Sequence, residues 1–168
     1  LKIFRDKYSD QNDQNPSYAI AQRIYNKIPI IYGVNEYTGI IAVRWKGQLS
    51  ENAKMLAFSN DLPEMNHNEI VGWGNNKTLM KKMSVIWLQD PEDHPKVIAR
   101  QTTTKDIIGK IASSHETISL EGNTQFNRLL HLVHYGDWVS YWCAVLHQTD
   151  PTPVTKIDQL KRIISKIS

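Results

Sequence analysis

The chain has 168 residues, of which 40% are hydrophobic and 9% aromatic, so it is long enough to bury the core of one ordinary domain. Its 20 Lys and Arg against 17 Asp and Glu give a formal net charge of +3, and the basic residues are spread along the chain. We therefore expect neither a nucleic-acid partner, which needs a basic stripe, nor a membrane span of roughly 18 apolar residues, and the single Cys143 fits the reducing cytoplasm.

The first segment of the chain is strongly polar. Residues 1–15 are rich in Asp, Asn and Gln, and we predict a frayed arm or an interdomain linker there, followed by one domain over 16–168. Pro16 and Ser17 then favour the start of a helix that covers 18–27.

Three short runs of β-branched and apolar residues predict buried strands, each closed by a turn of Gly, Pro or polar residues. These runs lie at 28–33, 83–88 and 117–120. Helical periodicity is found at 44–51, from near Glu64 after a break at 59–63, and at 92–110, 123–147 and 154–167. The alternation predicts an α/β fold, a three-layer sandwich with a mostly parallel sheet flanked by helices.

The segment 123–147 is apolar on more than one face. A helix of this kind is buried both against its own sheet and against a second surface. We therefore expect a subunit interface on this helix and a homodimer.

Polar residues share one face of the helix at 44–51. One stripe of apolar residues recurs at helical spacing and would face a core: Ile41, Trp45, Leu49, Ala53 and Leu56. A second stripe carries Arg44, Gln48 and Glu51. After the break at 59–63, the residues Asn66, His67, Asn68 and Glu69 follow in a row. We expect one cleft to collect a carboxylate, an imidazole and several amides.

The chain shows no Gly- or Ser-rich loop of the kind that holds a phosphate at a helix N-terminus. The turn after the first strand contains Glu36, and the turn at 121–124 begins with Glu121, so each would repel a phosphate. A phosphate would have to be held by a segment outside this chain.

Several segments resemble one family. IPIIYG (28–33), RWKGQLSENAK (44–54), LPEMNHNEIVGW (62–73), DHPKV (93–97) and DPTPVTKIDQLK (150–161) are similar to the C-terminal half of bifunctional phosphoglucose/phosphomannose isomerases. The longest unbroken piece, at 62–73, is the most specific. The resemblance implies that 16–168 is a C-terminal sugar isomerase (SIS) domain, in a homodimer whose subunits carry a further, N-terminal SIS domain that binds the sugar phosphate.

The resemblance also assigns site residues. A catalytic Glu followed sixteen residues later by a His matches Glu51 and His67, and the family's site lysine is placed at Lys161, with Lys156 as the weaker choice. Arg44, Gln48 and Asn66 would bind substrate. In such dimers the His acts across the interface, so His67 would serve the neighbouring subunit.

These residue types suit an aldose–ketose isomerisation through a cis-enediol between glucose 6-phosphate or mannose 6-phosphate and fructose 6-phosphate. A carboxylate partly desolvated against Trp45 or Phe58 can move a proton between C1 and C2. An imidazole can open the sugar ring near neutral pH, and a lysine can polarise an oxygen. We expect neither a cofactor nor a metal.

Other interpretations remain open. Glu64 or Glu69 could be the base, Asn66 to Asn68 could simply cap a helix, and His94 is a reserve candidate. His131 and His134 lie three apart on a helix, but packing explains them better than a metal. The alternative function is a regulatory SIS module that binds a sugar phosphate without turnover.

Overall fold

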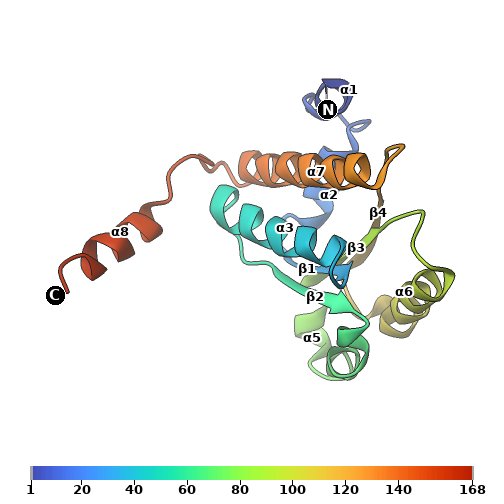
Figure 1. Cartoon of the computed structure of the whole chain (residues 1–168). Coiled ribbons are helices and arrows are strands. Elements are labelled where there is room, and N and C mark those ends of the chain that lie inside the picture. The colour runs from blue at the N-terminus through green and yellow to red at the C-terminus, as the bar shows by residue number, and fades with distance from the viewer. Residues whose placement is uncertain (1, 168) are drawn as a thin grey trace.

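The computed structural model describes residues 2–167. At its centre is a four-stranded sheet in the order β2-β1-β3-β4, in which all neighbouring strands run parallel. The strands are β1 (Ile28–Val34), β2 (Phe58–Leu62), β3 (Met83–Gln89) and β4 (Ser114–Ser119). Helices cover both faces of the sheet (Figure 1), so the predicted three-layer α/β sandwich is confirmed.

The helices take up most of the remaining chain. They are α1 (Lys2–Tyr8), α2 (Pro16–Ile24), α3 (Thr38–Asn52), α4 (Glu69–Gly72), α5 (Lys77–Met80), α6 (Pro95–Ile108), α7 (Gln125–Leu146) and α8 (Thr155–Ile164). Two 3-10 turns, η1 (Glu64–Asn66) and η2 (Gly109–Ile111), complete the set. Between residues 2 and 167, no helix has both the length and the apolar character needed to cross a membrane.

The core is divided in two by the sheet, because successive side chains of a strand point to opposite faces. Ile31 of β1 and Ile86 of β3 pack with α2, α3 and α7 on one face. Tyr32 and Trp87, their neighbours along the same strands, pack on the other face with η1 and α6. The continuous apolar runs of β1 and β3 follow from this burial on both faces.

Strand β2 was not among the strands that the sequence predicts. Its residues Ser59, Asn60 and Asp61 are polar and only half-buried, because β2 is the edge strand next to β1. Helix α3 also ends at Asn52, so Leu56, expected on its buried face, is 70% exposed.

The polar arm predicted for residues 1–15 needs correction at two residues. Tyr8 ends helix α1 and is fully buried, and its carbonyl oxygen accepts hydrogen bonds from Trp142 Nε1 and Asn15 Nδ2. Asn15 is also buried and caps α2 by accepting from the Ser17 and Tyr18 N–H groups. Whether the segment links two domains stays a prediction.

Helix α7 is covered largely by helices of its own chain. It packs against α2 and α3, and α1 lies against it as well (Figure 1). Trp142 is only 4% exposed, whereas Phe126 at the start of α7 is 67% exposed. This internal packing removes most of the reason to expect a subunit interface on α7, and the homodimer stays a prediction.

His131 joins α7 to α1 and carries a pH dependence. The Glu121 N–H donates to His131 Nδ1 at 3.0 Å, so the neutral ring holds its proton on Nε2 and donates it to the Tyr8 hydroxyl at 2.7 Å. Burial lowers the pKa of His131 below its ordinary value of 6.5, because the charged form would lose its solvation.

We expect this histidine to make the fold less stable in mild acid. Below a pH of about 6.5, His131 of the unfolded chain binds a proton, whereas His131 of the folded chain stays neutral. The free energy of unfolding therefore falls as the pH falls. In urea titrations, the drop from pH about 7.5 to about 5.5 should be larger for the natural chain than for His131→Gln, whose side chain does not titrate. His115 and His134, whose pKa values are also lowered by burial, are present in both proteins, although His134 lies close enough to His131 to interact with its charge. Equal drops would contradict the prediction.

Candidate functional site

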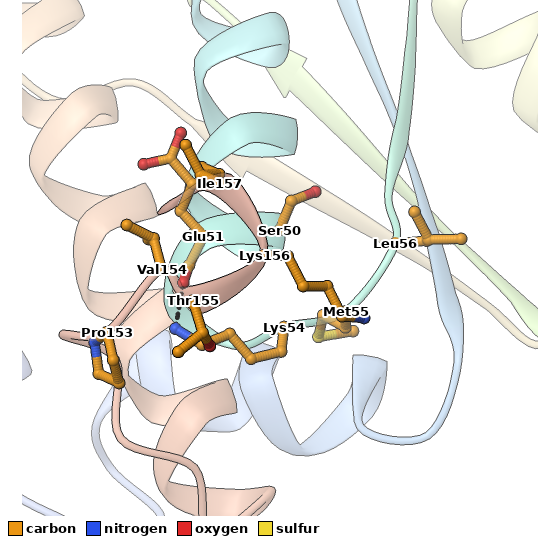
Figure 2. A pocket seen from close by; sticks show the side chains of 10 residues that line it. All are labelled: Ser50, Glu51, Lys54, Met55, Leu56, Pro153, Val154, Thr155, Lys156 and Ile157. Atoms are coloured by element: carbon orange, nitrogen blue, oxygen red, sulfur yellow. Dashed lines mark hydrogen bonds between the residues drawn. The ribbon is translucent and has the colours of Figure 1, made fainter. Parts of the chain in front are cut away.

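Glu51 lies near the end of α3 on the wall of a cavity of about 480 Å³. The cavity separates the last turn of α3 from the first turn of α8, and Figure 2 shows the Glu51 side chain beside Val154 and Ile157. Lys54 and Lys156 line the same cavity. An exposed carboxylate is thus held between apolar walls with two lysines nearby.

Buried contacts fix the helix that carries Glu51. Trp45 and Leu49 are each 1% exposed, and Trp45 Nε1 donates to the Leu132 carbonyl of α7 at 3.0 Å. Beyond the helix end, Lys54 Nζ donates to the carbonyls of Glu51 and Pro151 at 2.5 and 3.2 Å. A cation is favoured at a helix C-terminus, and here it also ties the segment before α8 to α3.

Arg44 and Gln48, predicted to bind substrate, both contact Asp137 of α7. Arg44 Nη2 donates to Asp137 Oδ1 at 3.1 Å, and Gln48 Nε2 donates to the same oxygen at 2.5 Å. The polar stripe of α3 therefore runs along α7, and Glu51 is the member that lines the cavity.

His67 is exposed and follows η1, beyond the carboxyl end of β2. Its neighbours are engaged within the fold: Asn66 Nδ2 donates to Thr104 Oγ1 at 2.7 Å, and the Asn68 side chain caps α4 by accepting from the Glu69 N–H at 2.5 Å. The capping role considered for this row thus holds for Asn68.

Within one subunit, the structure does not bring Glu51 and His67 together. Helix α3 ends on the side of the sheet where β2 begins, whereas His67 follows the end of β2 (Figure 1). Strand β2 alone spans roughly 13 Å at the usual rise of about 3.3 Å per residue. The two side chains therefore lie toward opposite ends of the sheet.

Lys161 lies on α8, which extends away from the body of the chain (Figure 1). Leu160, Ile163 and Ile164 on this helix are 57%, 55% and 56% exposed. Lys156, and not Lys161, lines the cavity with Glu51. In this arrangement the weaker sequence candidate is the lysine closer to the carboxylate.

The family follows from a model of the bacterial phospho-glucose isomerase C-terminal SIS domain, which matches residues 13–164. The chain belongs to this family. A bifunctional phosphoglucose/phosphomannose isomerase from Caldicellulosiruptor bescii is 40% identical over 169 residues, which is 99% of this chain and 50% of the relative. One from Aquifex aeolicus is 42% identical over 147 residues, 88% of this chain and 45% of the relative. The SIS domain thus spans about half the length of these relatives.

Two solved structures share the fold of this SIS domain. A glucose-6-phosphate isomerase like protein from Thermus thermophilus aligns with a TM-score of 0.68 at 16% identity, covering 83% of this chain and 46% of its own. A hypothetical protein from the same organism aligns with a TM-score of 0.80 at 8% identity, covering 98% and 48%. At such low identities the likeness concerns the fold alone.

The first turn of α3 follows β1, where many α/β proteins hold a phosphate on a helix N-terminus. In this SIS domain Asp61 fills that place: a Cβ on Gly39 would lie 2.2 Å from Asp61 Oδ1. The backbones of Gly33 and Gly39 also pack against each other, because a Cβ added at Gly33 would lie only 2.4 Å from the Gly39 nitrogen. Burial raises the pKa of Asp61. A phosphate at this turn would therefore meet the Asp61 carboxyl group.

A second acid, Asp90, fills the edge after β3. Arg128 Nε donates to Asp90 Oδ2 at 2.9 Å, the Tyr37 hydroxyl donates to the same oxygen, and Arg128 Nη2 donates to Glu92 at 2.6 Å. Burial opposes the charge of Asp90, but the hydrogen bonds from Tyr37, the Glu92 N–H and Arg128 hold its pKa below the ordinary value. Acidic side chains of the chain itself thus lie at the carboxyl ends of β1 and β3.

The reserve candidates take part in structural contacts. His94 caps α6 by accepting from the Lys96 N–H at 3.1 Å. Glu69 accepts from the Tyr32 hydroxyl at 2.5 Å and from Asn60 Nδ2 at 2.6 Å, and Glu64 accepts from Asn68 Nδ2 at 2.8 Å. His134 Nε2 accepts from Trp138 Nε1 at 3.2 Å.

Sequence reasoning missed Lys54 and Asp137. Lys54 lies just past a helix end, and the general preference for a cation there could have pointed to it. Asp137 carried no such signal, because only the packing of α7 on α3 brings it to Arg44 and Gln48, 93 and 89 residues away.

Proposed function

We propose that this SIS domain is the base-carrying half of an aldose–ketose isomerase that interconverts glucose 6-phosphate and mannose 6-phosphate with fructose 6-phosphate. The observation that carries the proposal is Glu51, whose exposed carboxylate lines a cavity with Lys54 and Lys156 in a chain of the phospho-glucose isomerase family. Glu51 would move the proton between C1 and C2 through a cis-enediol. The relatives named as bifunctional phosphoglucose/phosphomannose isomerases support this assignment of substrates.

In this proposal the phosphate is held by an N-terminal SIS domain of the full-length protein. Two observations support it. Asp61 and Asp90 place acidic groups at the carboxyl ends of the strands, and the relatives are about twice as long as this chain. The exposed apolar side chains of α8 would pack on that second domain and bring Lys161 toward the sugar. Lys156 is the alternative lysine, because it already lines the Glu51 cavity.

His67 would open the sugar ring in the active site of the neighbouring subunit of a homodimer. The positions of Glu51 and His67 toward opposite ends of the sheet support this assignment, since strand β2, which spans roughly 13 Å, runs between them. The substrate would be bound by Arg44, Gln48 and Asn66 only after they exchange their present partners, Asp137 and Thr104.

A subunit-mixing experiment tests the shared site. In the full-length enzyme, Glu51→Gln and His67→Ala homodimers should both be inactive on the closed-ring substrate. In a random equal mixture half of the dimers are mixed, and each has one intact site out of two, so about a quarter of the natural activity should return. Subunits with two different affinity tags would verify the exchange, and each variant mixed with itself is the control.

The outcomes separate the alternatives. If verified mixed dimers of two inactive variants regain no activity, both residues act in the site of one subunit. If one of the variant homodimers is active by itself, the residue replaced in it is not catalytic. If the natural full-length protein binds glucose 6-phosphate but shows no turnover, the chain is a sugar-phosphate sensor and the isomerase proposal is wrong.

A further inference from the structure

A second cavity, of about 460 Å³, lies between α6 and the turn that leads from η1 into α4. Asn66 and Ile70 form one wall, and α6 forms the other. No residue is shared with the Glu51 cavity. The two cavities also belong to opposite faces of the sheet, since α3 packs on the Ile31 face and α6 on the Tyr32 face.

The α6 wall is a single stripe of the helix. Lys96, Arg100, Thr103 and Ile107 follow one another at steps of four, three and four residues, which places them on one side of a helix. Two cations one turn apart are thus followed by a hydroxyl and an apolar side chain. No Asp or Glu of residues 2–167 lines this cavity.

One hydrogen bond joins the two walls, and a second one, within α6, fixes its acceptor. Asn66 Nδ2 donates to Thr104 Oγ1 at 2.7 Å, and Thr104 Oγ1 donates to the Arg100 carbonyl at 2.8 Å. The amide of Asn66 is therefore fixed in orientation before any ligand arrives. Such fixed polar groups reduce the entropy that a ligand must lose to bind.

In the described part of the chain, three groups of the cavity have no ion-pair or hydrogen-bond partner of opposite kind: the Lys96 ammonium, the Arg100 guanidinium and the Asn66 Oδ1 acceptor. Within residues 2–167, neither Lys96 nor Arg100 takes part in an ion pair. Asn66 Oδ1 is buried and has no donor. A buried acceptor without a donor is costly, so a ligand that brings both anionic oxygens and a hydroxyl would satisfy all three side chains.

We propose that this cavity binds a phosphorylated sugar, at a site separate from the Glu51 cavity. Arg100 holds the phosphate through its planar fork of donors, and Lys96 adds a second charge from the preceding turn. A sugar hydroxyl donates to Asn66 Oδ1, while Ile70 and Ile107 cover the carbon skeleton. In this proposal Asn66 keeps its hydrogen bond to Thr104 and binds the sugar of the second site, in place of the contact with the isomerised substrate given above.

Binding to the 168-residue chain tests the proposal without any activity assay. Calorimetry with glucose 6-phosphate should give saturable binding, about tenfold tighter than inorganic phosphate because one further hydrogen bond forms. Amide NMR signals of residues 96–104 should shift. Arg100→Gln should weaken binding by about tenfold or more, and Asn66→Ala should remove the preference for glucose 6-phosphate over inorganic phosphate.

The matched control is Lys110→Gln, which removes one positive charge from η2 outside the cavity. It should leave the affinity within about twofold, because exposed charges act weakly through salt solution. Thermal unfolding would confirm that the exposed Arg100→Gln variant is folded. Absence of shifts at 96–104, equal affinity for the two probes, or equal losses in Arg100→Gln and Lys110→Gln would each overturn the proposal. Because isomerase activity is not measured, this result stands apart from the test of Glu51.

Discussion

Replacing Glu51 by Gln in the full-length enzyme should lower kcat by about 10²- to 10⁴-fold, the usual contribution of a general base. The amide keeps the volume and one acceptor oxygen of the carboxylate but cannot take up the C2 proton. Since Glu51 is exposed at the end of α3, the substitution should leave the fold and sugar-phosphate binding nearly unchanged. Turnover is measured with a coupled assay for fructose 6-phosphate, and binding by calorimetry.

The matched variant is Glu64→Gln, which makes the same chemical change at an exposed carboxylate whose partner is Asn68. It should retain turnover within a few-fold. If instead Glu51→Gln keeps near-normal turnover and Glu64→Gln loses it, the base is Glu64. If neither variant loses activity, Glu69 becomes the candidate, although it already accepts hydrogen bonds from Tyr32 and Asn60.

Gly136→Ala should cause the largest loss of stability among the substitutions considered. A Cβ at this position in α7 would lie 2.1 Å from Trp45 Nε1 and 2.4 Å from Trp45 Cε2. The buried indole must shift and give up its hydrogen bond to the Leu132 carbonyl. Overpacking and an unpaired indole N–H together should lower the free energy of unfolding by about 2–4 kcal/mol, even after the gain in helix propensity. Urea unfolding followed by tryptophan fluorescence measures the change.

Gly47→Ala supplies the control on the same pair of helices. Gly47 lies inside α3, and no heavy atom is within 4 Å of the position its Cβ would take. The substitution should therefore raise the free energy of unfolding by about 0.5–1 kcal/mol, the usual advantage of Ala over Gly in a helix. Similar losses in both variants would show that α7 and α3 do not meet at Gly136 and Trp45 as described.

Two kinds of element follow from the sequence alone: strands that are buried on both faces, and helices whose apolar residues recur at helical spacing. The runs IPIIY in β1 and SVIWL in β3 are buried on both faces, so their composition alone indicates strands. Helix α3 is similar, because Ile41, Trp45 and Leu49 repeat at helical spacing and are all buried.

The missed parts depend on contacts between distant residues. FSNDL of β2 has no apolar run, and it is a strand because β1 offers it a partner from Ile30 to Val34. Tyr8 sits in a polar stretch and is buried by α7, through His131 and Trp142, 123 and 134 residues away. No local pattern encodes such pairings.

The candidate site likewise has a part that the sequence predicts and a part that only the structure shows. The resemblance placed Glu51 at a helix end, and the structure adds the cavity that it shares with Lys54 and Lys156. It could not reveal that Arg44 and Gln48 are held by Asp137, nor that Lys96 and Arg100 face Asn66 across a second cavity. Both arrangements depend on the rotation of one helix against another element, which sequence periodicity leaves undetermined.

The separation of Glu51 from His67 has a consequence for how the enzyme responds to its own abundance. In the proposed dimer each subunit contributes the base of one active site and the imidazole of the other. An isolated subunit therefore contains no complete active site. Mass action then governs catalysis: as the protein is diluted below the dissociation constant of the dimer, turnover per subunit falls with the fraction still paired. A cell that lowers expression of such a protein would lose activity more steeply than it loses protein.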